Sequence, residues 1–241
     1  WAVVFYAYSC KVNDLADYRT DRLNRTGRTR SPILRGDVSL EQVGYWTAVE
    51  ALGLGLALGL AEVDRSTKAL AFGLLVLTTY GNAFQKRSRA VSPLVMDYLF
   101  GVVMAAPILL VAWAWGGAIQ PTLVLISVCF LGQMVVLNAY SGNLKDLEHD
   151  MAVGDRTTAI VLGVRRVEAN RWDYPTAYLF YIFGSQFLST AALLVAAYIA
   201  LHGTPRGSTL AWLMWLTGGG LSILALAGLV SRLLHDRAGL R

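Results

Sequence analysis

The chain has 241 residues, of which 55% are hydrophobic and 15% are charged, and its formal net charge is +5. Soluble domains carry about 25% charged residues, so this composition excludes an ordinary water-soluble globular protein. Six prolines, two cysteines and long apolar runs also argue against disordered and disulfide-stapled folds. The sequence predicts an all-α, polytopic transmembrane helix bundle.

The apolar runs predict the individual helices. Residues 1–12 are typical of the last turns of a helix, and because the chain starts with Trp1 we expect an earlier segment. A helix crosses the bilayer with about 20 mostly apolar residues. Six later stretches predict such helices: 44–61, 69–83 (short, hence tilted or partly enclosed), 94–115, 121–141, 175–201 and 209–231. Gly55 and Gly59 in the first of them predict close helix packing.

The basic residues predict the topology. If successive connections alternate between two sides, one side receives 18 of the 21 Lys and Arg residues and the other receives Arg65, Lys68 and Arg206. Lys and Arg near helix ends favour the cytoplasmic side. We therefore expect a multi-pass integral membrane protein whose connections 11–43 and 142–174 are cytoplasmic, and we expect no nucleic acid as a partner.

Two acidic clusters interrupt these basic connections. The first contains Asn13, Asp14, Asp17 and Asp21, and the second contains Asn143, Asp146, Glu148 and Asp150. A spacing of four residues places several of these side chains on one helical face, where like charges repel unless a cation bridges them. Carboxylates combined with water and phosphate oxygens suit Mg²⁺. The clusters are consistent with two Mg²⁺ sites on either side of one diphosphate.

Basic and phenolic side chains near the clusters are suited to bind phosphate oxygens. These candidates are Arg22, Tyr80, Lys86, Lys145 and Arg156, with Lys11 and Arg25 as further ones. Gly154 and Thr157 predict a turn and a new helix start after the second cluster. Solvated loop charges are the alternative for either cluster alone, and an EF-hand fits neither because its twelve-residue oxygen pattern is missing.

The clusters resemble the two signatures of the UbiA superfamily of intramembrane prenyltransferases. Residues 13–22 (NDLADYRTDR) match the first signature, NDxxDxxxD, and residues 143–150 (NLKDLEHD) resemble the second, DxxxD-type signature. Residues 80–86 resemble the tyrosine-and-basic element between them, with Asp97 in the next helix. The resemblance implies a single domain over residues 1–241 with the family's nine-helix bundle around a central cavity, from which we expect the first and last helices to be missing.

This resemblance also implies a reaction. An isoprenyl diphosphate would be ionised with Mg²⁺, and the prenyl group would pass to an aromatic or lipophilic acceptor in a water-poor cavity. Catalytic roles would fall to Asp17, Lys86 and Asp146. Metal binding would fall to Asn13, Asp14, Asp17, Asp21, Asn143, Asp146 and Asp150. Ser31, Arg35 and Gly81 depart from the family pattern and leave the acceptor open.

Three alternatives stay open at this stage. A terpene cyclase on the same scaffold would use the same metal site, and prenyl transfer to a phosphosugar is a further alternative that the resemblance allows. A non-catalytic membrane subunit or transporter would need charge inside the membrane, for which Glu50 and Asp97 are the candidates. Charge is concentrated at one mouth of the predicted bundle, which favours the enzyme.

Overall fold

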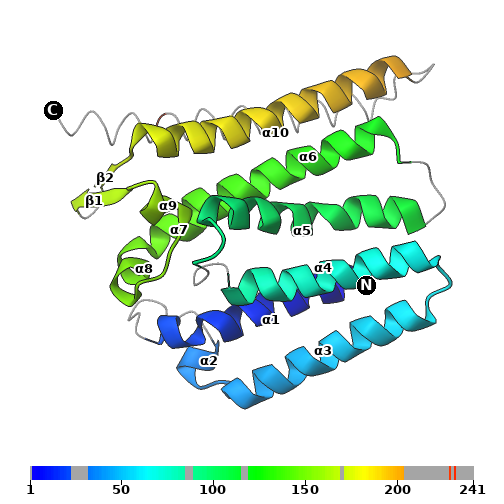
Figure 1. The fold of residues 1–241 in the computed structure, drawn as a ribbon, viewed down its shortest axis with the longest axis horizontal. Coiled ribbons are helices and arrows are strands. Elements are labelled where there is room, and N and C mark those ends of the chain that lie inside the picture. The colour runs from blue at the N-terminus through cyan, green and yellow to red at the C-terminus, as the bar shows by residue number, and fades with distance from the viewer. Residues whose placement is uncertain are drawn as a thin grey trace.

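The computed structural model describes residues 2–22, 32–84, 89–114, 119–168 and 171–203, together with Gly228 and Ser231. Its long helices run back and forth along one axis of an elongated bundle (Figure 1). In chain order the elements are α1 (Ala2–Asp21), α2 (Pro32–Arg35), α3 (Leu40–Leu60), α4 (Arg65–Phe84), α5 (Pro93–Ala114), α6 (Pro121–Val136), the π-helix η2 (Leu137–Gly142), α7 (Asn143–Lys145), α8 (Leu147–Val153), α9 (Thr158–Val161), β1 (Arg165–Glu168), β2 (Arg171–Asp173) and α10 (Thr176–Gly203).

Local sequence signals explain where several helices begin. The Ser39 hydroxyl accepts the Gln42 amide at 3.1 Å while the Gln42 side chain accepts the Ser39 amide at 2.9 Å, which is a complete capping box for α3. The Asp64 carboxylate accepts the Thr67 amide at 3.0 Å at the start of α4. Pro121 opens α6, where its missing N–H costs no helical hydrogen bond.

Two packed clusters of apolar side chains hold the bundle together. The first joins α1, α3, α4 and α5, and its buried members are Phe5, Tyr8, Val12, Leu54, Leu74, Leu75 and Val103. The second joins η2, α7, α8, α9 and the start of α10, and its buried members are Ala139, Leu144, Leu147, Ala159, Val164, Tyr174, Tyr178 and Ile182. Helix α6 connects the two parts of the bundle, because it contacts both α5 and α10.

Helices α6 and α10 approach each other closely at Gly132. A Cβ atom added at Gly132 would lie 2.8 Å from the Ser189 Cβ and 2.9 Å from the Ser185 carbonyl oxygen, so only glycine fits there without a shift. The predicted packing at Gly55 and Gly59 is wrong for the described part of the chain, because an added Cβ at either position would meet no atom within 4 Å. Small residues permit close packing but do not show where it happens.

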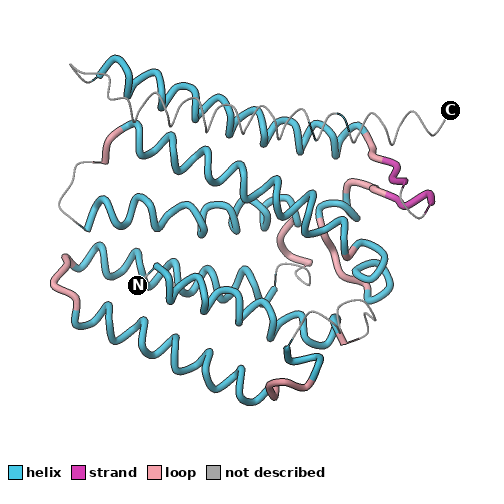
Figure 2. The backbone as a smooth tube through the Cα atoms, turned by 180° about the vertical axis from the view of Figure 1, so that it is seen from behind, coloured by secondary structure: helices cyan, strands magenta, loops and turns pink. Residues whose placement is uncertain are grey.

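The predicted transmembrane bundle is confirmed. Among the described residues, four helices are long and apolar enough to cross a bilayer: Leu40–Leu60, Pro93–Ala114, Pro121–Lys145 and Thr176–Leu201. The short stretch 69–83 forms α4 but is not one of these four, and the predicted stretch 209–231 lies outside the described residues apart from Gly228 and Ser231. Successive connections alternate between the two ends of the bundle, as predicted (Figures 1 and 2).

Among the described residues, a small hairpin departs from the otherwise all-helical secondary structure. Strands β1 and β2 pair antiparallel, with Arg165 opposite Asp173 and Arg166 opposite Trp172, beside the start of α10 (Figure 2). Arg166 also contacts the second acidic motif, since its guanidinium lies 3.0 Å from the Glu148 carboxylate and 5.6 Å from the centre of the Trp172 ring. The hairpin therefore ties α8 to the start of α10.

Candidate active site

The first acidic cluster lies on one uninterrupted helix. Because α1 continues to Asp21, residues Asn13, Asp17 and Asp21 share a helical face, as predicted. The pKa of Asp14 is raised above its ordinary value, mainly because its carboxyl group is partly buried and also because the Asp17 carboxylate lies nearby. The like charges are thus close enough to interact, and a cation would relieve their repulsion.

The second acidic cluster lies on an interrupted helix. The π-helix η2 leads into the short helix α7, and Asp146 sits at the junction before α8. The Asp150 amide still donates to the Asp146 carbonyl at 2.8 Å, so this pair keeps its helical spacing. Asn143 lies on the other side of the interruption, in α7. Single-turn π-helices occur frequently at functional sites.

The turn predicted after this cluster is confirmed. Gly154 ends α8 with φ of +76°, in the left-handed region that favours glycine. The Thr157 side chain then accepts the Ile160 amide at the start of α9. Both Asn143 and Asp150 are buried, the latter with 1% of its surface exposed.

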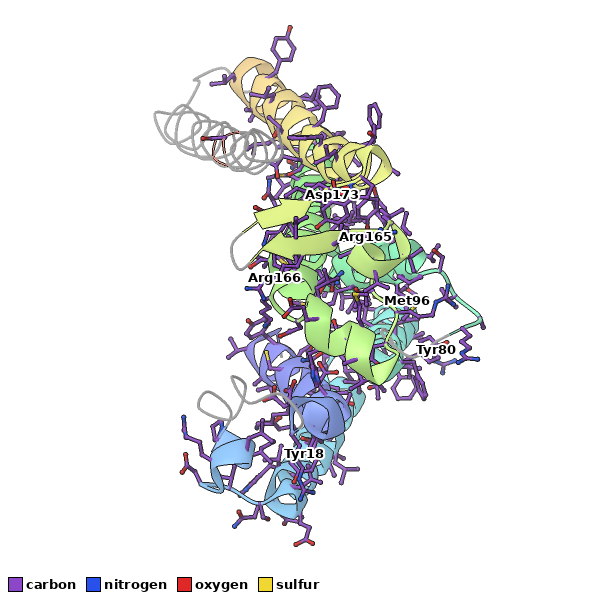
Figure 3. All side chains as sticks on the ribbon, turned by 90° about the vertical axis from the view of Figure 1, so that its left-hand side faces the viewer. Tyr18, Tyr80, Met96, Arg165, Arg166 and Asp173 are labelled. Carbon is purple, nitrogen blue, oxygen red and sulfur yellow. The ribbon has the colours of Figure 1, made fainter. Side chains whose placement is uncertain are left out.

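The fold brings the two clusters to the same end of the bundle. Helix α8 lies against α1, although more than a hundred residues separate them in the chain (Figure 1). Figure 3 looks onto this end, with Tyr18 of α1 and the hairpin residues Arg165 and Arg166 labelled. Within the described residues, no group of three His, Cys, Asp or Glu side chains forms a ready metal cage. The donor types nevertheless fit Mg²⁺, which binds through one or two carboxylates and completes its shell with water and phosphate oxygens.

A cavity of about 610 Å³ opens beside the first cluster, between α1, α4, α5, α6 and η2. Asn13 and Asp14 form part of its polar end, together with Asn82 and Asn138. The other residues that line it are Phe5, Tyr6, Ser9, Cys10, Phe100, Met104, Pro107, Phe130, Met134 and Leu137. One pocket thus combines carboxylate and amide oxygens at one end with apolar and aromatic walls over the rest.

Two asparagines of this cavity were missed by the sequence analysis. The Asn82 amide donates to the Ser9 carbonyl at 3.2 Å and to the Ser9 hydroxyl at 3.0 Å, which joins α4 to α1. The Asn138 amide in η2 donates to the Asp97 carboxylate at 2.8 Å. Both are lone amides within apolar stretches, and buried polar groups of that kind need partners, which was the available signal.

Asp97 is a buried hydrogen-bond acceptor beneath the second cluster. Only 1% of its surface is exposed. Besides Asn138, its carboxylate accepts the Thr158 hydroxyl of α9 at 2.5 Å and the Tyr181 hydroxyl of α10 at 3.1 Å. Asp97 therefore joins α5 to η2, α9 and α10, and a structural role accounts for its charge without a transport pathway.

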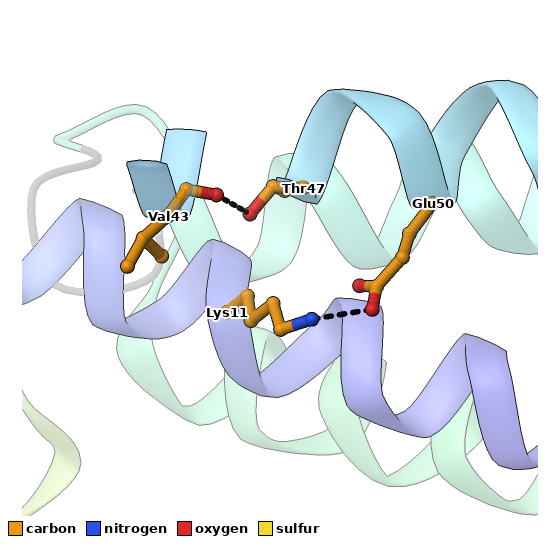
Figure 4. A network of polar contacts seen from close by, with 4 residues as sticks. All are labelled: Lys11, Val43, Thr47 and Glu50. Carbon is orange, nitrogen blue, oxygen red and sulfur yellow. Dashed lines mark hydrogen bonds and ion pairs between the residues drawn. The ribbon is translucent and has the colours of Figure 1, made fainter. Parts of the chain in front are cut away.

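Glu50, the other intramembrane charge, is also paired. The Lys11 ammonium group donates a hydrogen bond to the Glu50 carboxylate, and this ion pair joins α1 to α3 (Figure 4). The neighbouring Thr47 hydroxyl donates to the Val43 carbonyl of its own helix at 2.7 Å (Figure 4). Lys11 is thereby engaged by Glu50 rather than presented to the cavity.

The basic and phenolic candidates are more scattered than predicted. Lys145 lies 3.7 Å from Asp146 with 65% of its side chain exposed, and Tyr80 is exposed with its ring 5.1 Å from that of Phe84. Arg22 is exposed at the end of α1, Arg156 is partly buried, and Lys86 lies outside the described residues. Of the candidates that the structure describes, none lines the cavity.

Comparison with known proteins decides the family. The model of the UbiA prenyltransferase family matches residues 1–238. The chain belongs to the UbiA prenyltransferase family. The resemblance carried by the two acidic signatures is thus confirmed, and with it an integral membrane setting for the four apolar helices.

Two known proteins are similar to the chain over most of its length. A 4-hydroxybenzoate octaprenyltransferase of Paracidovorax citrulli (strain AAC00-1) is 30% identical over 186 residues, which cover 75% of this chain and 56% of that protein. The chain thus matches little more than half the length of this relative. The apo structure of a UbiA homolog from Aeropyrum pernix K1 has a TM-score of 0.71 and 16% identity, covering 97% of this chain and 79% of that one. The second similarity confirms the fold.

Proposed function

We propose that this UbiA protein is an Mg²⁺-dependent prenyltransferase that ionises an isoprenyl diphosphate and transfers the prenyl group to an aromatic or lipophilic acceptor. The observation that carries the proposal is the amphipathic cavity, whose polar end contains Asn13 and Asp14 of the first acidic motif. A prenyl diphosphate has the same division between a highly charged head and an apolar tail. The name of the octaprenyltransferase relative supports the same class of reaction.

The two motifs would hold the diphosphate end of the donor. Asn13, Asp17 and Asp21, assisted by Asp14, would bind one Mg²⁺, and Asp146 and Asp150, assisted by Asn143, would bind the other. Bound Mg²⁺ supplies positive charge that stabilises the departing diphosphate. The charged and phenolic groups proposed to contact its oxygens are Arg22, Tyr80, Lys86, Lys145 and Arg156.

The rest of the cavity would control the fate of the allylic cation. When the carbon–oxygen bond breaks, its electron pair leaves with the diphosphate and the allylic carbon becomes electron-poor. The acceptor then forms a bond to that carbon and loses a proton. Apolar walls such as Phe100, Phe130 and Met134 exclude water, which would otherwise capture the cation, and aromatic faces stabilise positive charge.

The orientation belongs to the same proposal. Of the Lys and Arg residues that the structure describes, all but Arg65 and Lys68 lie toward the end of the bundle that carries both motifs, and basic residues favour the cytoplasmic side. A donor made in the cytoplasm would therefore reach the motifs directly. Its apolar tail would extend toward the middle of the bilayer.

The test is Mg²⁺-dependent turnover by the purified protein, with geranyl, farnesyl and geranylgeranyl diphosphates and a membrane extract as the source of acceptor. Asp17→Ala and Asp146→Ala should each lower diphosphate release by about a hundredfold or more, because a carboxylate ligand is lost. Asp37→Ala is the matched control, since Asp37 is exposed at the same end and paired with Arg35. Full activity in the first two variants would disprove the metal assignment.

The same assay separates the rival functions. A cyclic product formed from the donor alone would identify a terpene cyclase, and a prenylated phosphosugar would identify that acceptor class. If the folded wild-type protein releases no diphosphate from any donor, a non-catalytic role replaces the proposed one.

A further inference from the structure

The side-chain amides of Asn82 and Asn138, at the polar end of the cavity, are each held in one orientation. A backbone carbonyl oxygen can only accept a hydrogen bond, so the Asn82 atom 3.2 Å from the Ser9 carbonyl oxygen is the amide nitrogen, which also lies 3.0 Å from the Ser9 hydroxyl. The Asp97 carboxylate accepts hydrogen bonds from three side chains, so the Asn138 atom 2.8 Å from it is the amide nitrogen as well. In both asparagines the amide oxygen is therefore the atom left for a ligand.

These two amide oxygens have no hydrogen-bond partner among the residues that the structure describes. Both side chains are partly buried and line the cavity. Covering a carbonyl oxygen without giving it a hydrogen bond costs free energy, because its interaction with water is lost and not replaced. A ligand that fills this end of the cavity favourably therefore brings a hydrogen-bond donor.

The two amides lie just inside the acidic motifs. Ser9, which holds Asn82, precedes Asn13 by four residues, a distance of about 6 Å along α1 at 1.5 Å per residue. Asn138 lies in η2 and precedes Asn143 of the second motif by five residues. The allylic carbon is bonded to the diphosphate that the motifs would hold, so an acceptor that attacks this carbon would lie beside the two amides.

Neither part of the prenyl donor suits these oxygens. Diphosphate oxygens are negatively charged acceptors, and the partial negative charge of an amide oxygen repels them. The isoprenyl tail has no hydrogen-bond donor. Two donors remain, namely a hydroxyl or N–H group of the acceptor and a water molecule bound to Mg²⁺. Most of the other lining residues are apolar or aromatic, which suits an organic molecule better than a hydrated ion.

We propose that Asn82 and Asn138 form the acceptor subsite, with their amide oxygens accepting hydrogen bonds from a hydroxyl or N–H group of the acceptor. Ser9 and Asp97 are the positioning residues that fix the two amides. The inference rests on the proposed function, because it takes the bound molecule to be the prenyl acceptor. It narrows the acceptor from any aromatic or lipophilic molecule to one that carries a hydrogen-bond donor.

A pair of probes that differ in one donor tests the subsite. 2-Naphthol and 2-methoxynaphthalene have the same ring system, but only the first has a hydroxyl group. In equilibrium dialysis of the purified protein in one detergent, the wild type should bind 2-naphthol about tenfold more tightly than the ether, because the ether leaves the amide oxygens unpaired. This comparison needs no variant, and a wild-type protein without a preference for 2-naphthol would overturn the proposal.

Three variants locate the preference. Asn82→Leu and Asn138→Leu each remove one amide oxygen at nearly constant side-chain size, so each should lower the ratio of the two affinities by about threefold or more. Gln133→Leu is the matched control, because the Gln133 amide also joins two helices, through a bond of 2.8 Å to Ser189, but does not line the cavity. A purely structural role of the asparagines would weaken both probes alike. An unchanged ratio in both asparagine variants would therefore overturn the subsite.

Donor binding separates the acceptor from Mg²⁺-bound water. Farnesyl S-thiolodiphosphate, a non-hydrolysable donor analogue, should bind with Mg²⁺ equally well to the wild type and to both asparagine variants. If the variants instead weaken this analogue by about threefold or more and keep the naphthol ratio, the amides serve the hydrated metal and the proposal is overturned. If the analogue and inorganic diphosphate both fail to bind to the wild type, the proposed function fails, and the assignment to an acceptor fails with it.

Discussion

Lys11 and Glu50 form an ion pair between α1 and an apolar, candidate membrane-spanning α3. A charge in such surroundings has lost part of its hydration and is tolerated when a partner compensates it. On α1, Lys11 directly follows Cys10 and lies three residues before Asp14, both of which line the cavity. The pair thus fixes the helix that presents the first acidic motif.

The first prediction concerns this pair. Lys11→Met leaves Glu50 charged and unpaired, so the free energy of unfolding should fall by about 1–3 kcal/mol, less than for a fully buried pair. The double variant Lys11→Met/Glu50→Gln should recover most of that loss, because no charge remains. Thermal unfolding in detergent micelles measures both, and equal destabilisation of the single and double variants would contradict the explanation.

Asp64 supports a prediction about pH, because it lies in the connection between α3 and α4. Hydrogen bonds from Ser66 and then Thr67 hold the pKa of Asp64 below its ordinary value of 3.8. Because the pKa of Asp64 is lower in the folded state than in the unfolded state, its charge stabilises the fold at pH values above the unfolded-state pKa. This stabilisation is lost as the pH falls through the folded-state pKa. Asp64→Ala should therefore unfold at a lower temperature than the wild type at pH 6–7. The difference between the two unfolding temperatures should become smaller below about pH 4. If this difference does not change with pH, the charge of Asp64 does not stabilise the start of α4.

The contact between α6 and α10 leaves no room for a side chain at position 132. Gly132→Ala should cost about 1–3 kcal/mol of unfolding free energy, because the new methyl group meets backbone and Cβ atoms that cannot turn aside. Gly184→Ala on α10 is the control, since an added Cβ there meets no described atom within 4 Å and alanine favours a helix by about 0.5–1 kcal/mol. Thermal unfolding of the two variants should move in opposite directions.

Element boundaries were predictable where the signal is local. Apolar runs and caps placed α3, α5 and α10 within a few residues, because burial in lipid requires an unbroken apolar helix. The interruption at Asp146 was not predictable. The elements on either side of it are joined to α5 by the contacts of Asp97 with Asn138, Thr158 and Tyr181, and no local pattern encodes contacts between residues 41 to 84 positions apart.

For the whole molecule, the alternation of connections predicts opposite exposure of two turns. In a background with Cys10→Ser and Cys129→Ser, a cysteine placed at Val167 in the hairpin should react with a membrane-impermeant maleimide only from the cytoplasmic face. A cysteine at Glu62, in the turn between α3 and α4, should react only from the opposite face. Labelling of both from one side would overturn the topology.

The two acidic motifs could be predicted from the sequence, whereas the lining of the cavity beside them could not. The paired motifs identified the family, and the alternating helices brought both to one end, because each span reverses the chain. The cavity beside Asn13 and Asp14 was beyond prediction in detail, since its lining comes from α1, α4, α5, α6 and η2. Which apolar side chain faces a cavity rather than lipid follows from helix rotation, and uniformly apolar helices carry no pattern that reveals it.

The π-helix η2 determines how far the second acidic cluster is rotated about the helix axis relative to α6. An α-helix turns about 100° per residue, so one residue absorbed in a wider turn rotates everything after it by about that amount. Shortening residues 137–142 by one would therefore rotate the Asp146 and Asp150 carboxylates by about a quarter of a circle relative to α6. The direction in which these carboxylates point is thus set by a segment that ends four residues before Asp146 and contributes no carboxylate of its own.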